Sequence, residues 1–280
     1  MKVKKILKNI GKAVLSISVI KKSSRFILAI IPISHQKRYN LRGIMESMCQ
    51  EEILKSKRGF YFPNRNIIGL YADEFSEWDD FSLLKEPKVI VEVGANIGID
   101  TIALAQKFPK AKIIAIEPCD KYRKILEMNV KGLNVEIYDY FLSSQNNEVE
   151  LNINSSSATV VENISSSFPT LEKQKVKSKK LDDLDLKFDL LKIDTDGWDE
   201  MVIRGGINSI LKQKPQLFAE LSGAKMPEGL SNESFLKLLD SMGYKNFVLL
   251  DRPNSIKAEG YKNLISLLKP DSSVDFIATM

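Results

Sequence analysis

Glycines and an acidic residue follow two short apolar segments in an arrangement that suits an adenosine-containing cofactor. The loop of residues 94–98 follows the β-branched run Val89–Val93, and Glu117 ends the next apolar run. Cofactors bind open α/β sheets at the carboxyl ends of the strands. Gly94 allows a sharp backbone turn beside a ligand, and Glu117 can accept hydrogen bonds from both ribose hydroxyls. We therefore expect Glu117 to bind the ribose.

The residues between the glycines distinguish two cofactors. In the dinucleotide fingerprint, a second glycine lets the backbone approach the pyrophosphate, whereas this sequence has Asn96 there. Glu92, inside the preceding strand, suits a cationic sulfonium ligand that also carries an ammonium group. We expect S-adenosylmethionine, with Glu92, Gly94, Asn96 and Gly98 around its methionine part and sulfonium. A dependence on NAD, and hence an oxidoreductase, is the alternative.

Carboxylates also end two later apolar runs. Asp194 follows residues 190–193, Asp196 lies two positions further, and Glu220 ends the next run. Parallel strands end at one edge of a sheet, so these carboxylates are expected to face one cleft beside the sulfonium. Three roles stay open for Asp194 and Asp196: a general base, a Mg²⁺ site built from Asp194 and Glu220, or a structural or cofactor-binding group such as a helix cap. Lys192 shares a strand face with Asp194, which predicts an ion pair.

Aromatic residues and the single histidine are weaker candidates. The third strand, expected over residues 135–142, ends where adenine would lie, so Asp139 or Phe141 is the expected adenine contact. Burial of Phe141 in the core is the alternative. Trp198 is expected either to form an aromatic wall for a sugar ring or to pack on its own helix. His35 lies far from these motifs, so we expect no catalytic histidine.

Two motifs resemble those of a known family. Residues 92–98 resemble the first motif of FkbM-family methyltransferases, and residues 191–197 resemble that family's Leu-Lys-Ile-Asp-x-Glu-Gly signature. The resemblance covers roughly residues 88–280, and it implies S-adenosylmethionine-dependent O-methylation, often of sugars or polyketide-like molecules. Asp196 stands where the family more often has Glu, and Trp198 where a small residue is common. The acceptor side is therefore expected to differ, and an inactive cofactor-binding module is a further alternative.

Alternating strand and helix patterns after Lys88 must position these residues. The pattern predicts an α/β fold: a Rossmann-like, class I methyltransferase sheet, mostly parallel, with helices on both faces. Residues 143–178, rich in Ser and Asn, are expected to form a hairpin or loop over the sheet and a candidate lid. Helices are expected over residues 99–108, 121–130 (capped by Asp120), 200–211 and 233–242, and further strands over residues 113–116, 217–220, 247–250 and 276–279.

A basic segment precedes this alternating part. Residues 1–45 hold 11 Lys and Arg and no Asp or Glu, so the rest of the chain holds 30 basic and 36 acidic residues. A nucleic-acid binder more often carries its basic surface on the folded domain, so no nucleic-acid partner is expected. Apolar residues every three or four positions predict an amphipathic helical arm over residues 1–45, before a cap over 46–86 and the cofactor domain over 87–280. The arm is expected to pack on the domain, to contact an anionic membrane through residues 1–33, or to be a targeting segment.

Composition excludes several classes of protein. The chain has 280 residues, of which 44% are hydrophobic and 28% charged, which excludes wholesale disorder. Two cysteines exclude a disulfide-framed scaffold, and both are expected to be buried thiols. The apolar runs are too short for a spanning helix, so we expect a cytoplasmic protein, with contact at the inner membrane face as the alternative. The acceptor is expected to be a small molecule or glycan, and the sequence leaves the oligomeric state open.

Overall fold

The computed structural model describes residues 53–55, 60–62, 78–154, 157–160, 170, 172–222, 226–250, 255–268 and 273–280. The basic arm and most of the cap lie outside these residues, so the arm's role and the domain boundaries stay predictions. Before the main sheet, the described residues include β1 (Leu54–Lys55), β2 (Tyr61–Phe62) and the 3₁₀ helix η2 (Trp78–Leu83). No helix of the described residues is long and apolar enough to cross a membrane.

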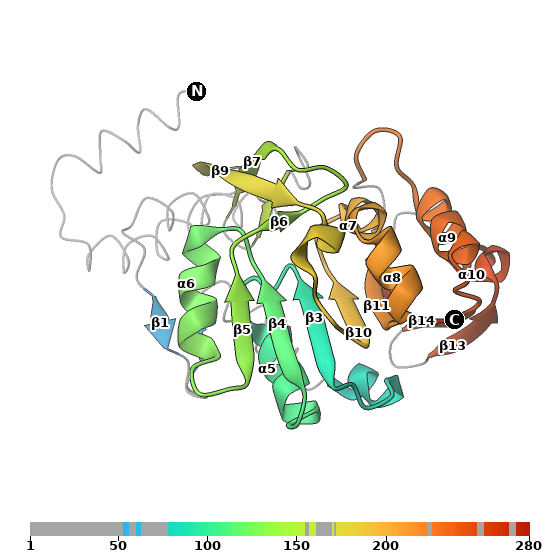
Figure 1. Ribbon diagram of the computed structural model, residues 1–280, viewed down its shortest axis with the longest axis horizontal. Coiled ribbons are helices and arrows are strands. Elements are labelled where there is room, and N and C mark those ends of the chain that lie inside the picture. Colours follow the sequence, from blue (N-terminus) through green and yellow to red (C-terminus); the bar gives the residue numbers. More distant parts are fainter. Residues whose placement is uncertain are drawn as a thin grey trace, which may run out of the picture.

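A large mixed sheet forms the centre of the molecule (Figure 1). Within the described residues its strand order is β13-β12-β14-β11-β10-β3-β4-β5. The run from β11 to β5 is parallel, and β14, β12 and β13 are antiparallel additions. The strands are β3 (Val89–Val93), β4 (Lys112–Ile116), β5 (Val135–Tyr138), β10 (Leu190–Ile193), β11 (Gln216–Leu221), β12 (Asn246–Leu249), β13 (Ile256–Glu259) and β14 (Val274–Thr279).

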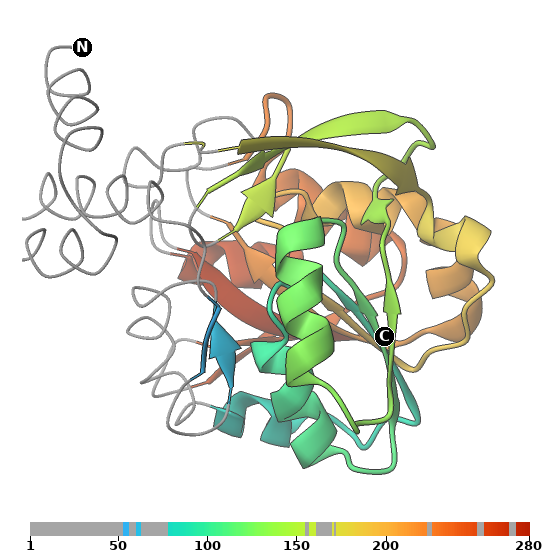
Figure 2. The same ribbon diagram turned by 90° about the vertical axis from the view of Figure 1, so that its left-hand side faces the viewer.

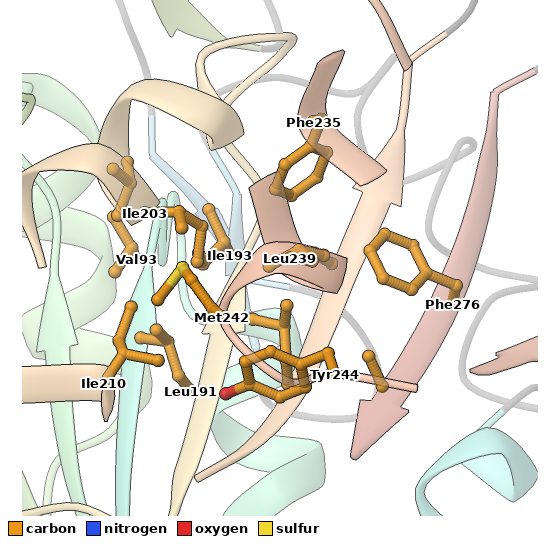
Figure 3. Close-up of a cluster of buried hydrophobic side chains, with 14 of the residues drawn as sticks. Val93, Leu191, Ile193, Ile203, Ile210, Phe235, Leu239, Met242, Tyr244 and Phe276 are labelled. Carbon is orange, nitrogen blue, oxygen red and sulfur yellow. The ribbon is translucent and has the colours of Figure 1, made fainter. Parts of the chain in front are cut away.

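Helices cover both faces of the sheet, as the alternating pattern predicts (Figures 1 and 2). On one face, α5 (Ile99–Lys107) and α6 (Asp120–Asn129) pack on apolar side chains of β3 and β4. On the other face lie α7 (Asp199–Gly205), α8 (Ile207–Gln213), α9 (Asn232–Ser241) and α10 (Tyr261–Leu267). Figure 3 shows this second core, where Val93, Leu191 and Ile193 of the sheet meet Ile203, Ile210 and Leu239 of the helices. The Rossmann-like fold class is thereby confirmed.

A second, smaller sheet lies above the carboxyl ends of the parallel strands (Figure 1). Its described strands are β6 (Phe141–Leu142), β7 (Glu148–Ile153), β8 (Ala158–Thr159) and β9 (Glu172–Lys179), in the order β6-β9-β7-β8. The expected single strand over residues 135–142 is therefore wrong. The chain leaves the main sheet after Tyr138 and enters the second sheet at Phe141. The expected hairpin over the main sheet is present as the antiparallel pair of β7 and β9.

Three other local predictions need correction. The helix expected over residues 200–211 is two helices, α7 and α8, which are separated at Gly206. Asp120 is the first residue of α6, and Cys119 holds the N-cap position. The strand β13 and the helix α10 were not expected, nor was the 3₁₀ helix η3 (Leu181–Leu184).

Candidate functional site

The glycine loop between β3 and α5 is held in left-handed backbone conformations. Gly94, Asn96 and Gly98 have φ values of 86°, 49° and 87°. A Cβ at Gly94 would lie 1.9 Å from the backbone oxygen of Asp194, so only glycine lets these two strand ends meet. A Cβ at Gly98 would lie 2.6 Å from Leu126 Cδ1, so this glycine lets α5 approach α6. Asn96 adopts the left-handed conformation without being glycine, a strained state that clusters at functional sites.

Glu117 lies beside the loop. Its side chain is 5% exposed. The backbone N–H of Asn96 donates to Glu117 Oε2, and the backbone N–H of Cys119 donates to Glu117 Oε1, both at 2.8 Å. Burial raises the pKa of Glu117 to about 7, although these two hydrogen bonds oppose the shift. The carboxylate is thus fixed in place, and its remaining lone pairs can accept hydrogen bonds from hydroxyl groups.

Lys192 is a buried cation with three carboxylates around it, of which Asp100 and Asp194 are partly exposed. Its Nζ lies 2.8 Å from Asp100 Oδ2, 3.7 Å from Glu92 Oε1 and 3.7 Å from Asp194 Oδ2. The predicted pairing of Lys192 with Asp194 is therefore confirmed. Burial alone would lower the pKa of Lys192, but the three carboxylates outweigh it and hold that pKa well above its ordinary value.

Glu92 belongs to the same group. Its side chain is fully buried, and Thr101 Oγ1 donates to its Oε2 at 2.6 Å. Within the described residues, Glu92 Oε1 has no hydrogen-bond partner. Burial raises the pKa of Glu92 to about 7, with Asp100 and Asp194 adding to the shift.

The predicted catalytic residues lie at the end of β10. Asp194 is half exposed, at 51% of its side chain, next to Lys192. Asp196 adopts a left-handed conformation, with a φ of 53°, in the turn that leads into α7. Trp198 holds the N-cap position of that helix, so the alternative of Asp196 as its cap residue is wrong.

Further acidic residues lie next to Asp194. Glu220, at the end of β11, has a pKa raised to about 8 by burial and then by the charges of Asp194, Asp199, Asp275 and Asp196. Asp199, at the start of α7, is 2% exposed, and burial with the nearby Asp194 raises its pKa to about 7. In the part of the chain that the structure describes, no three acidic, cysteine or histidine residues are arranged to hold a metal ion. The Mg²⁺ alternative therefore gains no support.

The two predicted adenine contacts lie in different environments. Asp139 is exposed in the link between β5 and β6, whereas Phe141 is 6% exposed in the second sheet. The rings of Phe141 and Trp198 lie 6.0 Å apart, and Trp198 Nε1 donates to Ser143 Oγ at 3.3 Å. Phe141 and Trp198 thus join the second sheet to α7, and an adenine contact by Asp139 or Phe141 stays a prediction.

Sequence reasoning missed four residues of this site: Asp100, Thr101, Asp199 and Asp275. Asp100 and Thr101 lie on the first turn of α5, just after Gly98. Polar residues at this point, next to the end of β3, are a sequence signal by which they could have been found. Cys119 is fully buried beside Glu117, as expected, and burial raises its pKa to about 11. Cys49 lies outside the described residues.

A parallel sheet with a glycine loop and strand-end acids at its carboxyl edge defines a Rossmann-like cofactor-binding domain. The family model described as "Methyltransferase FkbM domain" matches residues 92–247, which is more than half of the chain. The chain belongs to the FkbM methyltransferase family, as its motifs predicted.

Individual relatives are distant. A segment of 81 residues is 32% identical to the AMB antimetabolite synthetase AmbE of Pseudomonas aeruginosa. The matched segment covers 28% of this chain and 4% of that protein. A solved methyltransferase FkbM from Methylobacillus flagellatus is 14% identical with a TM-score of 0.43, covering 91% of this chain and 58% of that one. A SAM-dependent methyltransferase from Aquifex aeolicus is 13% identical with a TM-score of 0.40, covering 74% and 89%. The chain thus spans less than two thirds of the length of the first two relatives.

Proposed function

We propose that this protein transfers a methyl group from S-adenosylmethionine to a hydroxyl group of a sugar, glycan or secondary metabolite. The observation that carries the cofactor assignment is the junction of the glycine loop with Glu117, where the Asn96 N–H donates to Glu117 Oε2 at 2.8 Å. This contact holds the Glu117 carboxylate against the loop that follows β3, which supports a role for Glu117 in binding the ribose.

The charges around the loop support a cationic cofactor over NAD. Glu92 is fully buried with Oε1 free of hydrogen bonds within the described residues, and Asp194 is half exposed at the adjacent strand end. Two carboxylates at this point attract an ammonium or sulfonium group and repel a pyrophosphate. The residues present therefore fit S-adenosylmethionine, which supplies a methyl group on a cationic sulfur.

Asp194 is the residue that we place nearest to the transfer. It ends the strand beside the loop, and its carboxylate has Lys192 Nζ 3.7 Å away. A carboxylate here can take the proton of an acceptor hydroxyl, or orient that hydroxyl by accepting its hydrogen bond.

Cofactor class is tested by calorimetry with the full chain, titrated with S-adenosylhomocysteine and separately with NAD⁺. We expect binding of S-adenosylhomocysteine alone. Glu117→Gln keeps the shape of the side chain but removes its charge, and it should weaken that binding ~10- to 100-fold, since hydrogen bonds to a charged group contribute ~1.5–3 kcal/mol.

Glu127→Gln provides the matched control, because Glu127 is exposed on the same helix that follows Glu117. This variant should bind S-adenosylhomocysteine as the parent protein does. Binding of NAD⁺ without S-adenosylhomocysteine would refute the proposed function, and equal effects of the two substitutions would remove Glu117 from the ribose site.

A further inference from the structure

A row of carboxylates lies at the carboxyl ends of β10 and β11 and at the amino end of β14, on the side away from the proposed ribose ligand. In the antiparallel pair of β11 and β14, Glu220 lies directly opposite Asp275. In the parallel pair of β10 and β11, Ile193 is in register with Ala219, so the next residues, Asp194 and Glu220, are neighbours. Side chains at paired positions point to the same face of a sheet. Three carboxylates on neighbouring strands therefore face one side of this edge.

Asp199 adds a buried carboxyl group with an unused acceptor. Its side chain is 2% exposed, and Thr195 Oγ1 donates to Asp199 Oδ2 at 2.8 Å. Within the described residues, Asp199 Oδ1 is buried and accepts no hydrogen bond. The charge of Asp194 acts on Asp199, and the charges of Asp194 and Asp199 both act on Glu220, so Asp199 lies within electrostatic range of the row. A buried polar atom without a partner is costly, so this oxygen points to a donor that a ligand brings.

Lys192, the cation that pairs with Asp194, lies nearer to Asp100 than to the row. Lys192 Nζ lies closest to Asp100, at 2.8 Å, and reaches Asp194 only at 3.7 Å. Among the described residues, Ser222 Oγ donates a hydrogen bond to Glu220 Oε2, at 3.2 Å. Neighbouring carboxylates such as Asp194 and Glu220 repel each other, unless they share a proton or a cation lies between them.

We propose that Glu220 and Asp199, beside Asp194, recognise an ammonium group on the methyl acceptor, which makes the acceptor an amine-bearing molecule such as an amino sugar. The inference rests on the proposed function. If the cofactor binds at the ends of β3 and β4, the acceptor binds at the ends of β10 and β11. An ammonium group has three N–H donors and no acceptor, which suits three carboxylates. While protonated, this nitrogen has no lone pair, so the methyl group goes to a hydroxyl and the amine serves for recognition.

The test uses the full chain saturated with S-adenosylhomocysteine and measures binding by calorimetry and saturation-transfer NMR. The probes are matched amine and neutral pairs on different frameworks: glucosamine against glucose and N-acetylglucosamine, tyramine against 4-hydroxyphenethyl alcohol, and ethanolamine against ethylene glycol. We expect at least one amine to bind about tenfold or more tightly than its neutral partner, since charge-assisted hydrogen bonds are roughly twice as strong as neutral ones. Glu220→Gln and, separately, Asp199→Asn should reduce that preference to less than about threefold.

Glu259→Gln is the control, because Glu259 is exposed on β13, and it should keep the preference. The inference is overturned if no amine is preferred over its neutral partner in any pair. It is also overturned if the protein binds Mg²⁺, titrated as MgCl₂ alone, and Glu220→Gln abolishes that binding. Saturation with S-adenosylhomocysteine is checked in the same samples. If it binds and no amine is preferred, the inference fails while the proposed function stands; if it does not bind, the proposed function itself fails.

Discussion

At the scale of single residues, Lys192 has the largest electrostatic role in the site. Its Nζ lies among Glu92, Asp100 and Asp194, and its side chain is 3% exposed. Replacing it by methionine keeps the length of the side chain but leaves Glu92 buried without a countercharge. We expect Lys192→Met to lower the free energy of unfolding by ~3–5 kcal/mol, the usual cost of breaking a buried ion pair. The loss should be smaller at low pH, where Glu92 is protonated and needs no partner.

Urea unfolding of both proteins at about pH 5 and about pH 8 measures this dependence. Lys212→Met is the matched control, because Lys212 is exposed on α8, and its effect should stay within ~0.5 kcal/mol. An equal loss at both pH values would show that Lys192 contributes packing and not charge compensation.

At the scale of elements, the end of α7 lies in close contact with the backbone of the segment after β6. A Cβ at Gly205 would lie 2.1 Å from the backbone oxygen of Ser143, which follows β6. Alanine would gain ~1 kcal/mol in helix propensity, but overpacking a buried contact costs ~1–3 kcal/mol, and here the obstacle is backbone. We therefore expect Gly205→Ala to lower the urea midpoint, whereas Lys212→Ala on α8 should leave it nearly unchanged. A more stable Gly205→Ala protein would show that this contact is not tight in solution.

A comparison of the strands shows which of them the sequence pattern alone can predict. The runs at β3, β4 and β10 are short and apolar, so they predict buried parallel strands, and the acids that end them fall at one edge as expected. β9 has the sequence EKQKVKSK, and only Val176 and Ser178 of it are buried, so it carries almost no apolar signal. The end of α7 makes a close contact with Ser143, far away in sequence, and helical periodicity does not encode such a contact.

The candidate site was predictable in part for the same reason. Gly94, Glu117 and Asp194 were identified because each directly follows an apolar run. Asp275 was not, because the last strand was expected to start at residue 276, whereas β14 starts at Val274 and pairs Asp275 with Glu220. Strand pairing between distant segments decides which carboxylates meet, and a single sequence does not state that pairing.

At the scale of the whole molecule, the buried acids predict how stability depends on pH. Burial raises the pKa of Glu92, Glu117 and Asp199 to about 7, and that of Glu220 to about 8. The unfolded carboxyls have pKa values near 4, so between about pH 4 and pH 8 the folded state binds more protons than the unfolded state. Stability then falls as pH rises, because ∂ΔG/∂pH follows the protons bound in the unfolded state minus those bound in the folded state.

We expect the melting temperature of the ligand-free protein to fall steadily from about pH 6 to about pH 8.5 at constant ionic strength. Glu92→Gln mimics the protonated form of one of the four acids, so it should flatten this slope, whereas Glu127→Gln, at an exposed site, should leave the slope unchanged. S-adenosylmethionine should stabilise the protein more at the higher pH, because its cationic groups bind the ionised carboxylates. A melting temperature that rises over this range would contradict the prediction. It would mean that these acids are already ionised in the folded protein near pH 6, because nearby positive charges lower their pKa values more than burial raises them.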